Sequence, residues 1–303
     1  MHSTRAAPAP ARYLQPATLP DALAALAAAP FTVLAGGTDF YPGRVGKPVD
    51  DVALLDITRV AGLAGISRAG EGWRIGATTS WRELAEADDL PAAFDGLRAA
   101  ARVVGGAQIQ NSGTVAGNLC NASPAADGVP PLLALAAEVE LASTAGTRRL
   151  PLAQFVLGNR KTARAPHELL TAILIPAWPA DARGVFLKLG PRKYLVISIA
   201  MVSVVAALDA GGRIARCGIA VGACSAAALS FDTLAQGLVG RTPAEALASL
   251  TPADLQGLAP INDVRGSAAY RIDAALVLVR QALAKALGQT TAQAAGATPG
   301  QTP

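Results

Sequence analysis

The chain has 303 residues, of which 51% are hydrophobic and 16% are charged, and its net charge is +4. This composition excludes an intrinsically disordered protein and supplies enough apolar side chains for the cores of two domains. The basic residues are scattered and lack the interleaved aromatic residues of a nucleic-acid-binding surface, so we expect no nucleic-acid partner.

Cysteine and histidine are rare in this chain. The three cysteines form no CxxC pair, and the two histidines lie far apart in the sequence, so we expect neither a disulfide framework nor a metal site. The N-terminus has no hydrophobic export segment, and the longest apolar run, residues 194–208, is shorter than the roughly 20 residues of a membrane span. We therefore expect a cytoplasmic protein without a membrane span.

The first part of the chain alternates between helix and strand patterns. A Pro- and Ala-rich arm over residues 1–11 is expected to be flexible, and a short Ala/Leu helix covers residues 21–29. Buried strands are predicted over residues 31–34 and 52–57, the first of them ending in a glycine pair. This alternation predicts an α/β layer.

The next part leads into a polar stretch with almost no charge. A strand is predicted over residues 73–77, and the capping box that begins at Ser80 predicts the start of a helix. The polar stretch, residues 108–127, is expected to be a long loop. Near its end, Ser123 and the proline after it predict the start of a helix over residues 124–136.

The second half of the chain is rich in strand patterns. A cluster of Pro, Trp and Asp over residues 176–182 marks a domain boundary. Apolar runs over residues 184–189, 196–208 and 213–221 predict antiparallel strands, the last two joined by an Asp-Ala-Gly-Gly turn. A long final helix over residues 268–287 precedes a polar tail that we expect to be disordered.

The glycine pair Gly36-Gly37 stands at the end of a strand, where an open α/β sheet usually places its ligand crevice. Glycines there let backbone N–H groups approach phosphate oxygens, and Thr38 adds a hydroxyl donor. Taken alone, such a pair is more often an ordinary tight turn. The segment lacks the Lys-Ser/Thr of a P-loop and is not a complete GxGxxG fingerprint.

The polar stretch supplies a second turn of small residues around Thr114, Gly117 and Asn118. Asp127 follows nine residues after Asn118, and its carboxylate is suited to accept hydrogen bonds from ribityl or ribose hydroxyls. The alternative is that Asp127 complements the dipole of the predicted helix. Two such loops in one domain favour a clamp for a phosphate-bearing cofactor.

Four ordered motifs resemble the FAD-binding (medium) subunit of the molybdenum hydroxylases, namely AGGTDFYP, QIQNSGTVAGNLCNASPAADGVPPLLAL, GNRKTARAPHELLTAILIP and FLKLGPRKYLVIS. This is the family of xanthine dehydrogenase, aldehyde oxidoreductase and carbon monoxide dehydrogenase. The resemblance implies an α+β fold, with a vanillyl-alcohol-oxidase/PCMH-type FAD-binding domain of two α/β subdomains. A smaller domain with a three-stranded antiparallel sheet and helices would follow. The implied parts are a flexible arm (1–11), the FAD-binding domain (12–178, subdomains about 12–58 and 59–178), the C-terminal domain (179–288) and a disordered tail (289–303).

The resemblance also implies the residues that bind FAD non-covalently. They are Leu34, Ala35, Gly36, Gly37, Thr38, Asp39, Phe40, Val104, Thr114, Val115, Ala116, Gly117, Asn118, Ser123, Asp127, Leu170 and Lys188. The two small-residue loops would cradle the pyrophosphate and Asp127 would anchor the ribityl chain. Leu170 would press against the isoalloxazine, and Lys188 would lie at its polar edge, where a cation stabilises the anionic reduced ring.

Two of these assignments have open alternatives, and two positions depart from the family pattern. Lys188 is either a ring-edge residue or a solvent-facing strand lysine, and Tyr194 either shields the ring or belongs to the core. Ala116 replaces a glycine and Gln110 an arginine that many members have. Cys120, inside the polar stretch, is expected to be a packing residue rather than a redox centre.

The resemblance implies an electron-transfer role in an oxidoreductase complex. A large subunit would carry the molybdenum cofactor and oxidise an aldehyde or a xanthine-like N-heterocycle, and a small ferredoxin-like subunit would carry 2Fe-2S clusters. FAD would pass the electrons to NAD, oxygen, a quinone or another acceptor. A single heterotrimer and a dimer of heterotrimers are both open alternatives. The alternatives are a stand-alone FAD-dependent reductase or oxidase of the same fold and a flavin-free scaffold subunit.

Overall fold

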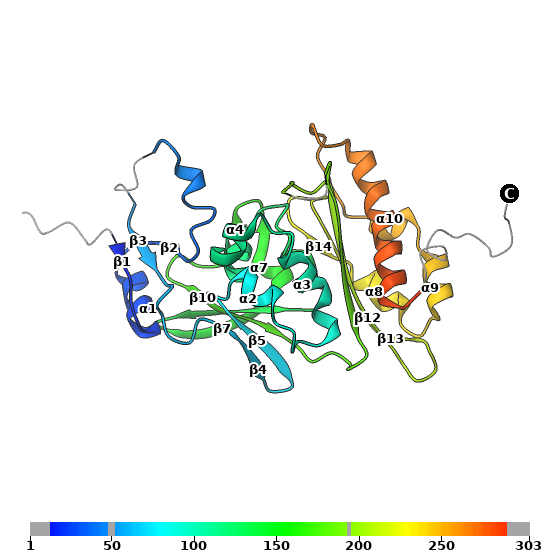
Figure 1. Ribbon diagram of the computed structural model, residues 1–303, viewed down its shortest axis with the longest axis horizontal. Helices are drawn as coiled ribbons and strands as arrows, with labels where there is room; N and C mark the ends of the chain where they lie inside the picture. Colours follow the sequence, from blue (N-terminus) through cyan, green and yellow to red (C-terminus); the bar gives the residue numbers. More distant parts are fainter. Residues whose placement is uncertain (1–12, 48–51, 193–194, 290–303) are drawn as a thin grey trace, which may run out of the picture.

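The computed structural model describes residues 13–47, 52–192 and 195–289. The expected arm, nearly all of the expected tail and Tyr194 lie outside the described residues. Figure 1 shows three successive parts along the longest axis, a small N-terminal sheet, a middle sheet with short helices, and a C-terminal sheet backed by a long helix. Within the described ranges, no helix is both long and apolar enough to cross a membrane.

A small parallel sheet in the order β1-β3-β2 forms the N-terminal part. It consists of β1 (Tyr13–Leu14), β3 (Leu54–Asp56) and β2 (Thr32–Leu34). Helix α1 (Leu19–Ala28) is capped by Thr18, whose side chain accepts a hydrogen bond from the third residue after it, and its apolar face packs on this sheet. Strand β2 leads directly into the glycine pair, so the sheet fixes where that turn begins.

The middle sheet is antiparallel, in the order β4-β5-β10-β6-β7. Its strands are β4 (Ile66–Ala69), β5 (Gly72–Gly76), β10 (Leu169–Ile175), β6 (Glu138–Ser143) and β7 (Gly146–Pro151). Strand β10 comes last in the chain yet lies at the centre of the sheet. The residues just before β10 are therefore brought back to the middle of the molecule.

Short helices cover the middle sheet and fill the space toward the C-terminal part. They are α2 (Trp81–Ala85), η2 (Ala92–Phe94), α3 (Asp95–Ala101), α6 (Val129–Ala134) and α7 (Leu152–Phe155), whereas η1 (Pro42–Arg44) belongs to the N-terminal part. The capping box predicted at Ser80 is confirmed, since Ser80 and Glu83 exchange side-chain and backbone hydrogen bonds. A hairpin of β8 (Val156–Gly158) and β9 (Lys161–Thr162) follows α7.

The long loop predicted over residues 108–127 is wrong in its first two thirds, because two short helices occupy it. These are α4 (Ala107–Ser112) and α5 (Val115–Asn121). Thr114 caps α5 by accepting a hydrogen bond from the N–H of Gly117 at 3.0 Å. The buried side chains of α5 are apolar, but a two-turn helix is too short to show a clear helical periodicity in the sequence.

The helix predicted over residues 124–136 is also wrong in extent, because only α6 is helical there. Pro130 and Pro131 are tolerated in the first turn of a helix but not in its interior, so the helix starts one residue before them. Ser123 does not cap this helix. Its hydroxyl instead accepts a hydrogen bond from the N–H of Ala125 at 3.3 Å and closes a local turn.

The C-terminal sheet contains the three expected strands, β11 (Arg183–Leu189), β12 (Ala200–Leu208) and β13 (Ile214–Gly222). A fourth strand at its edge, β14 (Leu229–Ser230), corrects the expected count, because two residues are too few to give a strand pattern. Helices α8 (Asp232–Leu238), α9 (Pro243–Ser249), η3 (Pro252–Leu255) and α10 (Ala268–Ala286) complete this part.

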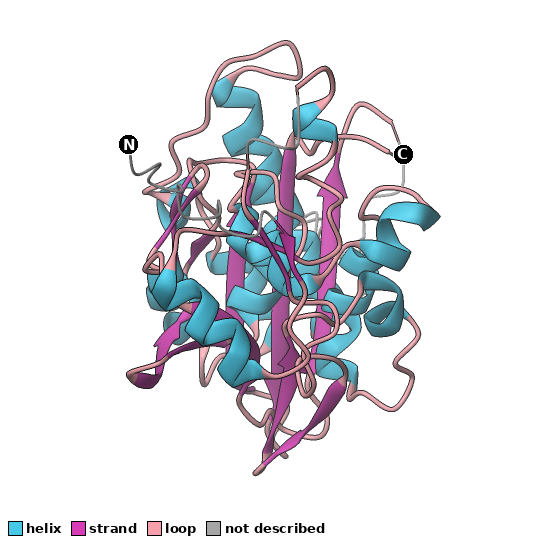
Figure 2. Ribbon diagram, turned by 90° about the vertical axis from the view of Figure 1, so that its left-hand side faces the viewer, coloured by secondary structure: helices cyan, strands magenta, loops and turns pink. Residues whose placement is uncertain are grey.

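Strand β12 is buried on both faces. Val205 and Ala207 belong to the core of the middle part, whereas Val202 and Val204 pack with α10. This explains the nearly continuous apolar run of the sequence, in which only Ser203 is polar, and its buried hydroxyl donates a hydrogen bond to the carbonyl oxygen of Val185. Figure 2 shows long strands running through the molecule with helices on either side. The C-terminal sheet is thus one wall of the middle core.

Candidate cofactor site

A cavity of about 640 Å³ lies between the glycine-rich segment after β2, the α4–α5 region and the β9–β10 segment. Its volume falls within the roughly 300–1,000 Å³ typical of small-molecule sites. Most of the predicted cofactor residues line it, which are Leu34, Ala35, Gly36, Gly37, Thr38, Asp39, Phe40, Val104, Thr114, Ala116, Gly117, Asn118 and Leu170. The fold therefore brings the two small-residue loops to one site.

The glycine pair packs so closely that no side chain fits. A Cβ atom on Gly36 would lie 1.7 Å from the carbonyl oxygen of Ser112 and 3.0 Å from Cα of Gly113. Gly37 has a left-handed backbone with φ of +68°, and a Cβ atom there would lie 2.7 Å from the Tyr41 ring. The two loops therefore touch backbone to backbone, and because both line the cavity with small residues, few side chains separate their main chains from a ligand such as a pyrophosphate.

Helix α5 forms the opposite wall of the cavity. A Cβ atom on Gly117 would lie 2.7 Å from the hydroxyl oxygen of Thr114, so a side chain would break the cap of the helix. Asn118 accepts a hydrogen bond from the N–H of Gly128 at 3.3 Å, which ties α5 to the start of α6. Ala116 is 3% exposed and packs in the middle core, next to the cavity that it helps to line.

The resemblance motifs contained several lining residues to which the sequence assigned no role. These are Asn121, Arg160, Thr162 and Arg164. Their only signal was their presence in the stretches GNLCN and GNRKTAR of the motifs, which did not indicate that the two segments meet. Cys120 also lines the cavity and its side chain is exposed, so it is not the packing residue that the sequence led us to expect.

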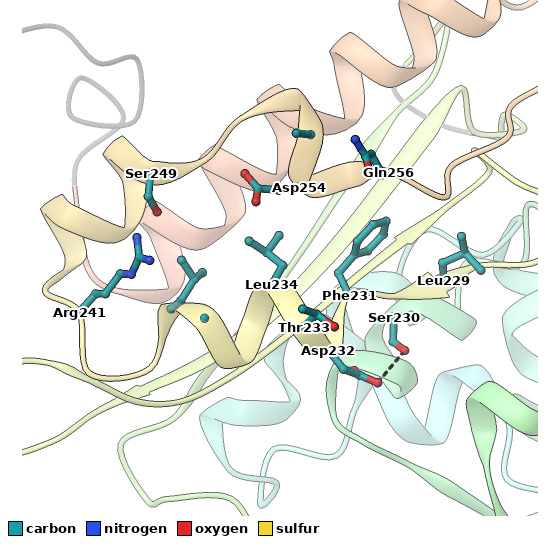
Figure 3. A pocket seen from close by; sticks show the side chains of 13 residues that line it. Leu229, Ser230, Phe231, Asp232, Thr233, Leu234, Arg241, Ser249, Asp254 and Gln256 are labelled. Carbon is teal, nitrogen blue, oxygen red and sulfur yellow. Dashed lines mark hydrogen bonds between the residues drawn. The ribbon is translucent and has the colours of Figure 1, made fainter.

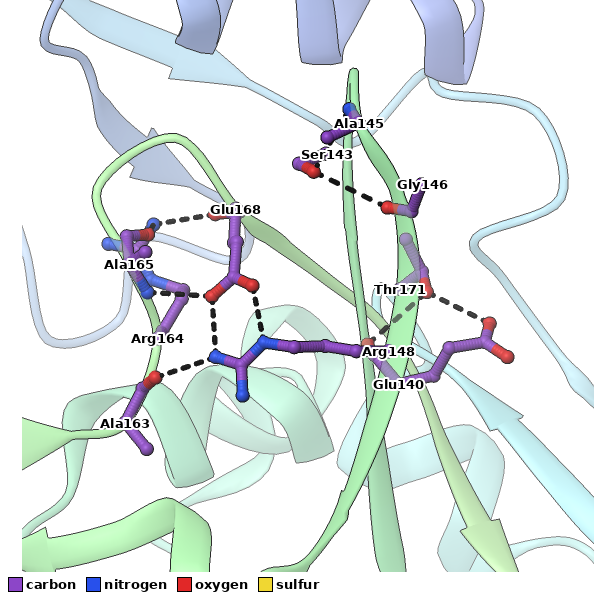
Figure 4. Close-up of polar contacts among 10 residues, drawn as sticks. All are labelled: Glu140, Ser143, Ala145, Gly146, Arg148, Ala163, Arg164, Ala165, Glu168 and Thr171. Atoms are coloured by element: carbon purple, nitrogen blue, oxygen red, sulfur yellow. Dashed lines mark hydrogen bonds and ion pairs between the residues drawn. The ribbon is translucent and has the colours of Figure 1, made fainter.

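An ion pair between the half-exposed Arg148 and the buried Glu168 supports the wall that carries Arg164 and Leu170 (Figure 4). Glu168, only 7% exposed, accepts hydrogen bonds from Nε of Arg148 at 2.5 Å, from its Nη2 at 2.8 Å and from the N–H of Ala165 at 2.7 Å. Arg164 donates to the carbonyl oxygen of Glu168 at 2.7 Å. These contacts fix the segment that leads into β10.

We expect this ion pair to make the fold sensitive to acid. The hydrogen bond from Arg148 holds the pKa of Glu168 below its usual value of 4.5. The ion pair therefore contributes stability above pH 4.5 and loses it as the pH falls through the lower folded value. In urea unfolding between pH 3 and 6, a Glu168→Gln variant is expected to lose less stability on acidification than the original chain. Equal losses in the two proteins would contradict this role.

Four predicted residues do not line the cavity. Val115 is fully buried and Ser123 lies in the turn before α6. Asp127 and Lys188 contact each other instead, with Nζ of Lys188 2.8 Å from Oδ2 of Asp127, and Ser198 donates a hydrogen bond to the other carboxylate oxygen at 3.4 Å. Their assignment to the ribityl chain and the ring edge stays a prediction.

The Asp127–Lys188 pair is buried at the junction of the middle and C-terminal parts. The side chains are 11% and 13% exposed, so Lys188 is not a solvent-facing lysine. Burial raises the pKa of Asp127, while the charge of Lys188 and the hydrogen bond from Ser198 act in the opposite direction. The pair therefore joins β11 to the turn before α6 by a direct charge contact.

A second hollow, of about 560 Å³, lies in the C-terminal part near α8 and η3 (Figure 3). It contains none of the predicted site residues. Two of its acidic side chains are engaged locally, since Ser230 donates to Asp232 at 3.2 Å and Asp254 accepts from the N–H of Thr251 at 2.7 Å. Within the described part of the chain, no group of His, Cys, Asp or Glu side chains is placed to hold a metal ion.

Family models match two consecutive parts of the chain. The FAD binding domain in molybdopterin dehydrogenase matches residues 9–178, and the CO dehydrogenase flavoprotein C-terminal domain matches residues 186–286. A solved structure of reconstituted CO dehydrogenase from Oligotropha carboxidovorans superimposes with a TM-score of 0.84 at 30% identity. The match covers 92% of this chain and 98% of that one.

Curated relatives agree with these matches over most of the chain. The xanthine dehydrogenase FAD-binding subunit of Escherichia coli O157:H7 is 32% identical, with 84% of each chain covered. The 6-hydroxypseudooxynicotine dehydrogenase complex subunit alpha of Paenarthrobacter nicotinovorans is 30% identical, with 84% of this chain and 86% of the relative covered. The backbone cradle described above fits the cofactor that the family description names. The chain therefore belongs to the FAD-binding medium subunits of the molybdenum hydroxylase family and is part of an oxidoreductase.

Proposed function

We propose that this chain is the electron-transfer subunit of a molybdenum hydroxylase complex. Its FAD takes electrons from the 2Fe-2S clusters of a small ferredoxin-like subunit, which drain the molybdenum cofactor of a large subunit, and passes them to an external acceptor. The observation that carries the proposal is the side-chain-free cradle around Gly36 and Gly113, in a chain matched over its length by flavoprotein family models. Relatives described as medium chains or as subunits of complexes support the existence of such partners.

We place the FAD pyrophosphate between Gly36-Gly37 and the start of α5. The close approach of these backbones supports this position, because a phosphate needs N–H groups without intervening side chains. Val104 and Leu170 supply the apolar contacts for the ring. When bound, FAD exchanges one or two electrons, which suits a carrier between iron–sulfur centres and a two-electron acceptor.

We place the polar edge of the ring toward Lys188, beyond the apolar end of the cavity. Asp127 holds the Lys188 ammonium group in position through their 2.8 Å contact, and the same carboxylate is the proposed partner of the ribityl hydroxyls. In this proposal the substrate pocket belongs to the large subunit, which oxidises an aldehyde or an N-heterocycle, and this chain does not determine which one. We also propose a cytoplasmic location and a division into an FAD-binding domain over 12–178 and a C-terminal domain over 179–288.

Absorption spectra of the chain, purified alone and together with co-expressed partner subunits, test the proposal. We expect flavin absorption in both samples, release of intact FAD on acid treatment, and additional iron–sulfur absorption in the complex. Reduction of the flavin by substrate is expected only in the complex. A folded chain without flavin in both samples would restore the scaffold alternative. Oxidation of an aldehyde by the isolated chain would instead favour the stand-alone enzyme.

A further inference from the structure

Three side chains from distant segments meet at the rim of the cavity. The guanidinium of Arg160, in the β8–β9 turn, donates to Asp39 with Nη1–Oδ2 at 2.5 Å and Nη2–Oδ1 at 3.3 Å. It also donates to the side-chain oxygen of Asn121, and Asn121 donates to Asp39 at 3.1 Å. We call Arg160, Asp39 and Asn121 the rim clasp. It joins the glycine-rich segment, the end of α5 and the hairpin.

The backbone conformation at Arg160 directs its side chain toward Asp39 and Asn121. Arg160 has a left-handed φ of 57°, and its N–H donates to the carbonyl oxygen of Ala122 at 2.9 Å. Ala122 ends α5 and is itself left-handed, with φ of 48°. Residues other than glycine rarely adopt this conformation, and it persists where the surrounding structure imposes it. The hairpin is therefore fastened to the end of α5, and its arginine is directed at the glycine-rich segment.

The opposite charges of Asp39 and Arg160 suit a site for an anionic cofactor. Asp39 is the one acidic residue among those that line the cavity, and it lies two residues after Gly37. Beside a pyrophosphate its carboxylate would repel the ligand unless a cation neutralised it. Arg160 provides that cation and at the same time ties the loop to the opposite wall.

We propose that Arg160 is a positioning residue that closes the glycine-rich loop over FAD and slows release of the cofactor. This inference rests on the proposed location of the pyrophosphate. Arg160 acts through Asp39 and Asn121, so the effects of replacing Arg160 and Asp39 should not add. Because the side chains of Arg160 and Asp39 are 59% and 51% exposed, salt should weaken their contact.

The test measures the rate of FAD dissociation from the holo complex by the recovery of flavin fluorescence after dilution. Arg160→Ala is expected to release FAD about tenfold faster, and Arg160→Lys to retain part of the effect. The Asp39→Asn/Arg160→Ala double variant should release FAD no faster than Arg160→Ala alone. Added salt should speed release from the original protein but not from Arg160→Ala.

Arg82→Ala is the matched control. Arg82 is also 59% exposed, pairs with Glu86 at 2.9 Å and donates to Asn111 at 3.3 Å, but it does not line the cavity. Its removal should leave FAD release unchanged. If the Arg160→Ala variant released FAD at the rate of the original protein, the proposed role of the rim clasp would be wrong.

A second measurement distinguishes failure of the clasp from failure of the cofactor location. Cys120 lines the same cavity, so bound FAD should protect it from alkylation, as read by mass spectrometry of its peptide. Protection together with an unchanged release rate in Arg160→Ala overturns the clasp alone. Absence of protection in the original protein overturns the cofactor location and the clasp together.

Discussion

A Gly36→Ala variant is expected to bind FAD about tenfold to a hundredfold more weakly than the original chain, and yet to fold. The new methyl group would lie 1.7 Å from the carbonyl oxygen of Ser112, so the two loops must move apart. Overpacking of this kind costs about 1–3 kcal/mol. Once the two loops have moved apart, their backbones can no longer contact the pyrophosphate at the same time. Titration of the apoprotein with FAD, followed by flavin fluorescence, measures the loss.

Gly43→Ala is the control for this variant. Gly43 lies in the same segment, in η1, but a Cβ atom there meets nothing within 4 Å. It should bind FAD as the original chain does, and its circular dichroism spectrum should match that of Gly36→Ala. If Gly36→Ala bound FAD with undiminished affinity, the cofactor would not depend on contact between the two loops.

The second large effect is expected at the junction of the middle and C-terminal parts. Asp127→Asn would leave the Lys188 ammonium group buried without its carboxylate partner, and removal of one member of a buried ion pair costs about 3–5 kcal/mol. We expect a clear decrease in the thermal midpoint of the apoprotein. The unpaired charge causes this loss, so it should occur without FAD.

The Asp127→Asn/Lys188→Met double variant separates this charge effect from simple loss of packing. With the ammonium group replaced by an apolar side chain, the double variant should be more stable than Asp127→Asn. It should nevertheless bind FAD poorly if both residues contact the cofactor as proposed. A double variant less stable than Asp127→Asn would show that the ion pair is not the source of the stability.

Local patterns predicted much of the fold. The capping box at Ser80 is present, because a cap depends on residues three apart. The strands of the C-terminal sheet follow from apolar runs and from the turn at Asp209, which accepts hydrogen bonds from the N–H groups of Gly211 and Arg213. The cofactor loops were identified from ordered motifs, not from physical pattern alone.

The rest of the site depends on contacts between distant residues. Asp39 and Arg160 are 121 residues apart, and Arg148 and Glu168 are 20 apart, so no local pattern indicates either pair. The sequence placed Asp127 and Lys188 separately around the cofactor. It did not show that β11 packs beside the turn before α6, which brings the carboxylate and the ammonium group into direct contact.

The burial of β12 on both faces limits how a gene for such a protein can be assembled from separate parts. Residues such as Val205 and Ala207 would meet water if the C-terminal part were produced alone, and the middle part would lose one wall of its core. Exposed apolar strand faces promote aggregation. Although two family models divide the chain, its two parts share a core, so shuffling either part into another gene would require a replacement for the lost wall.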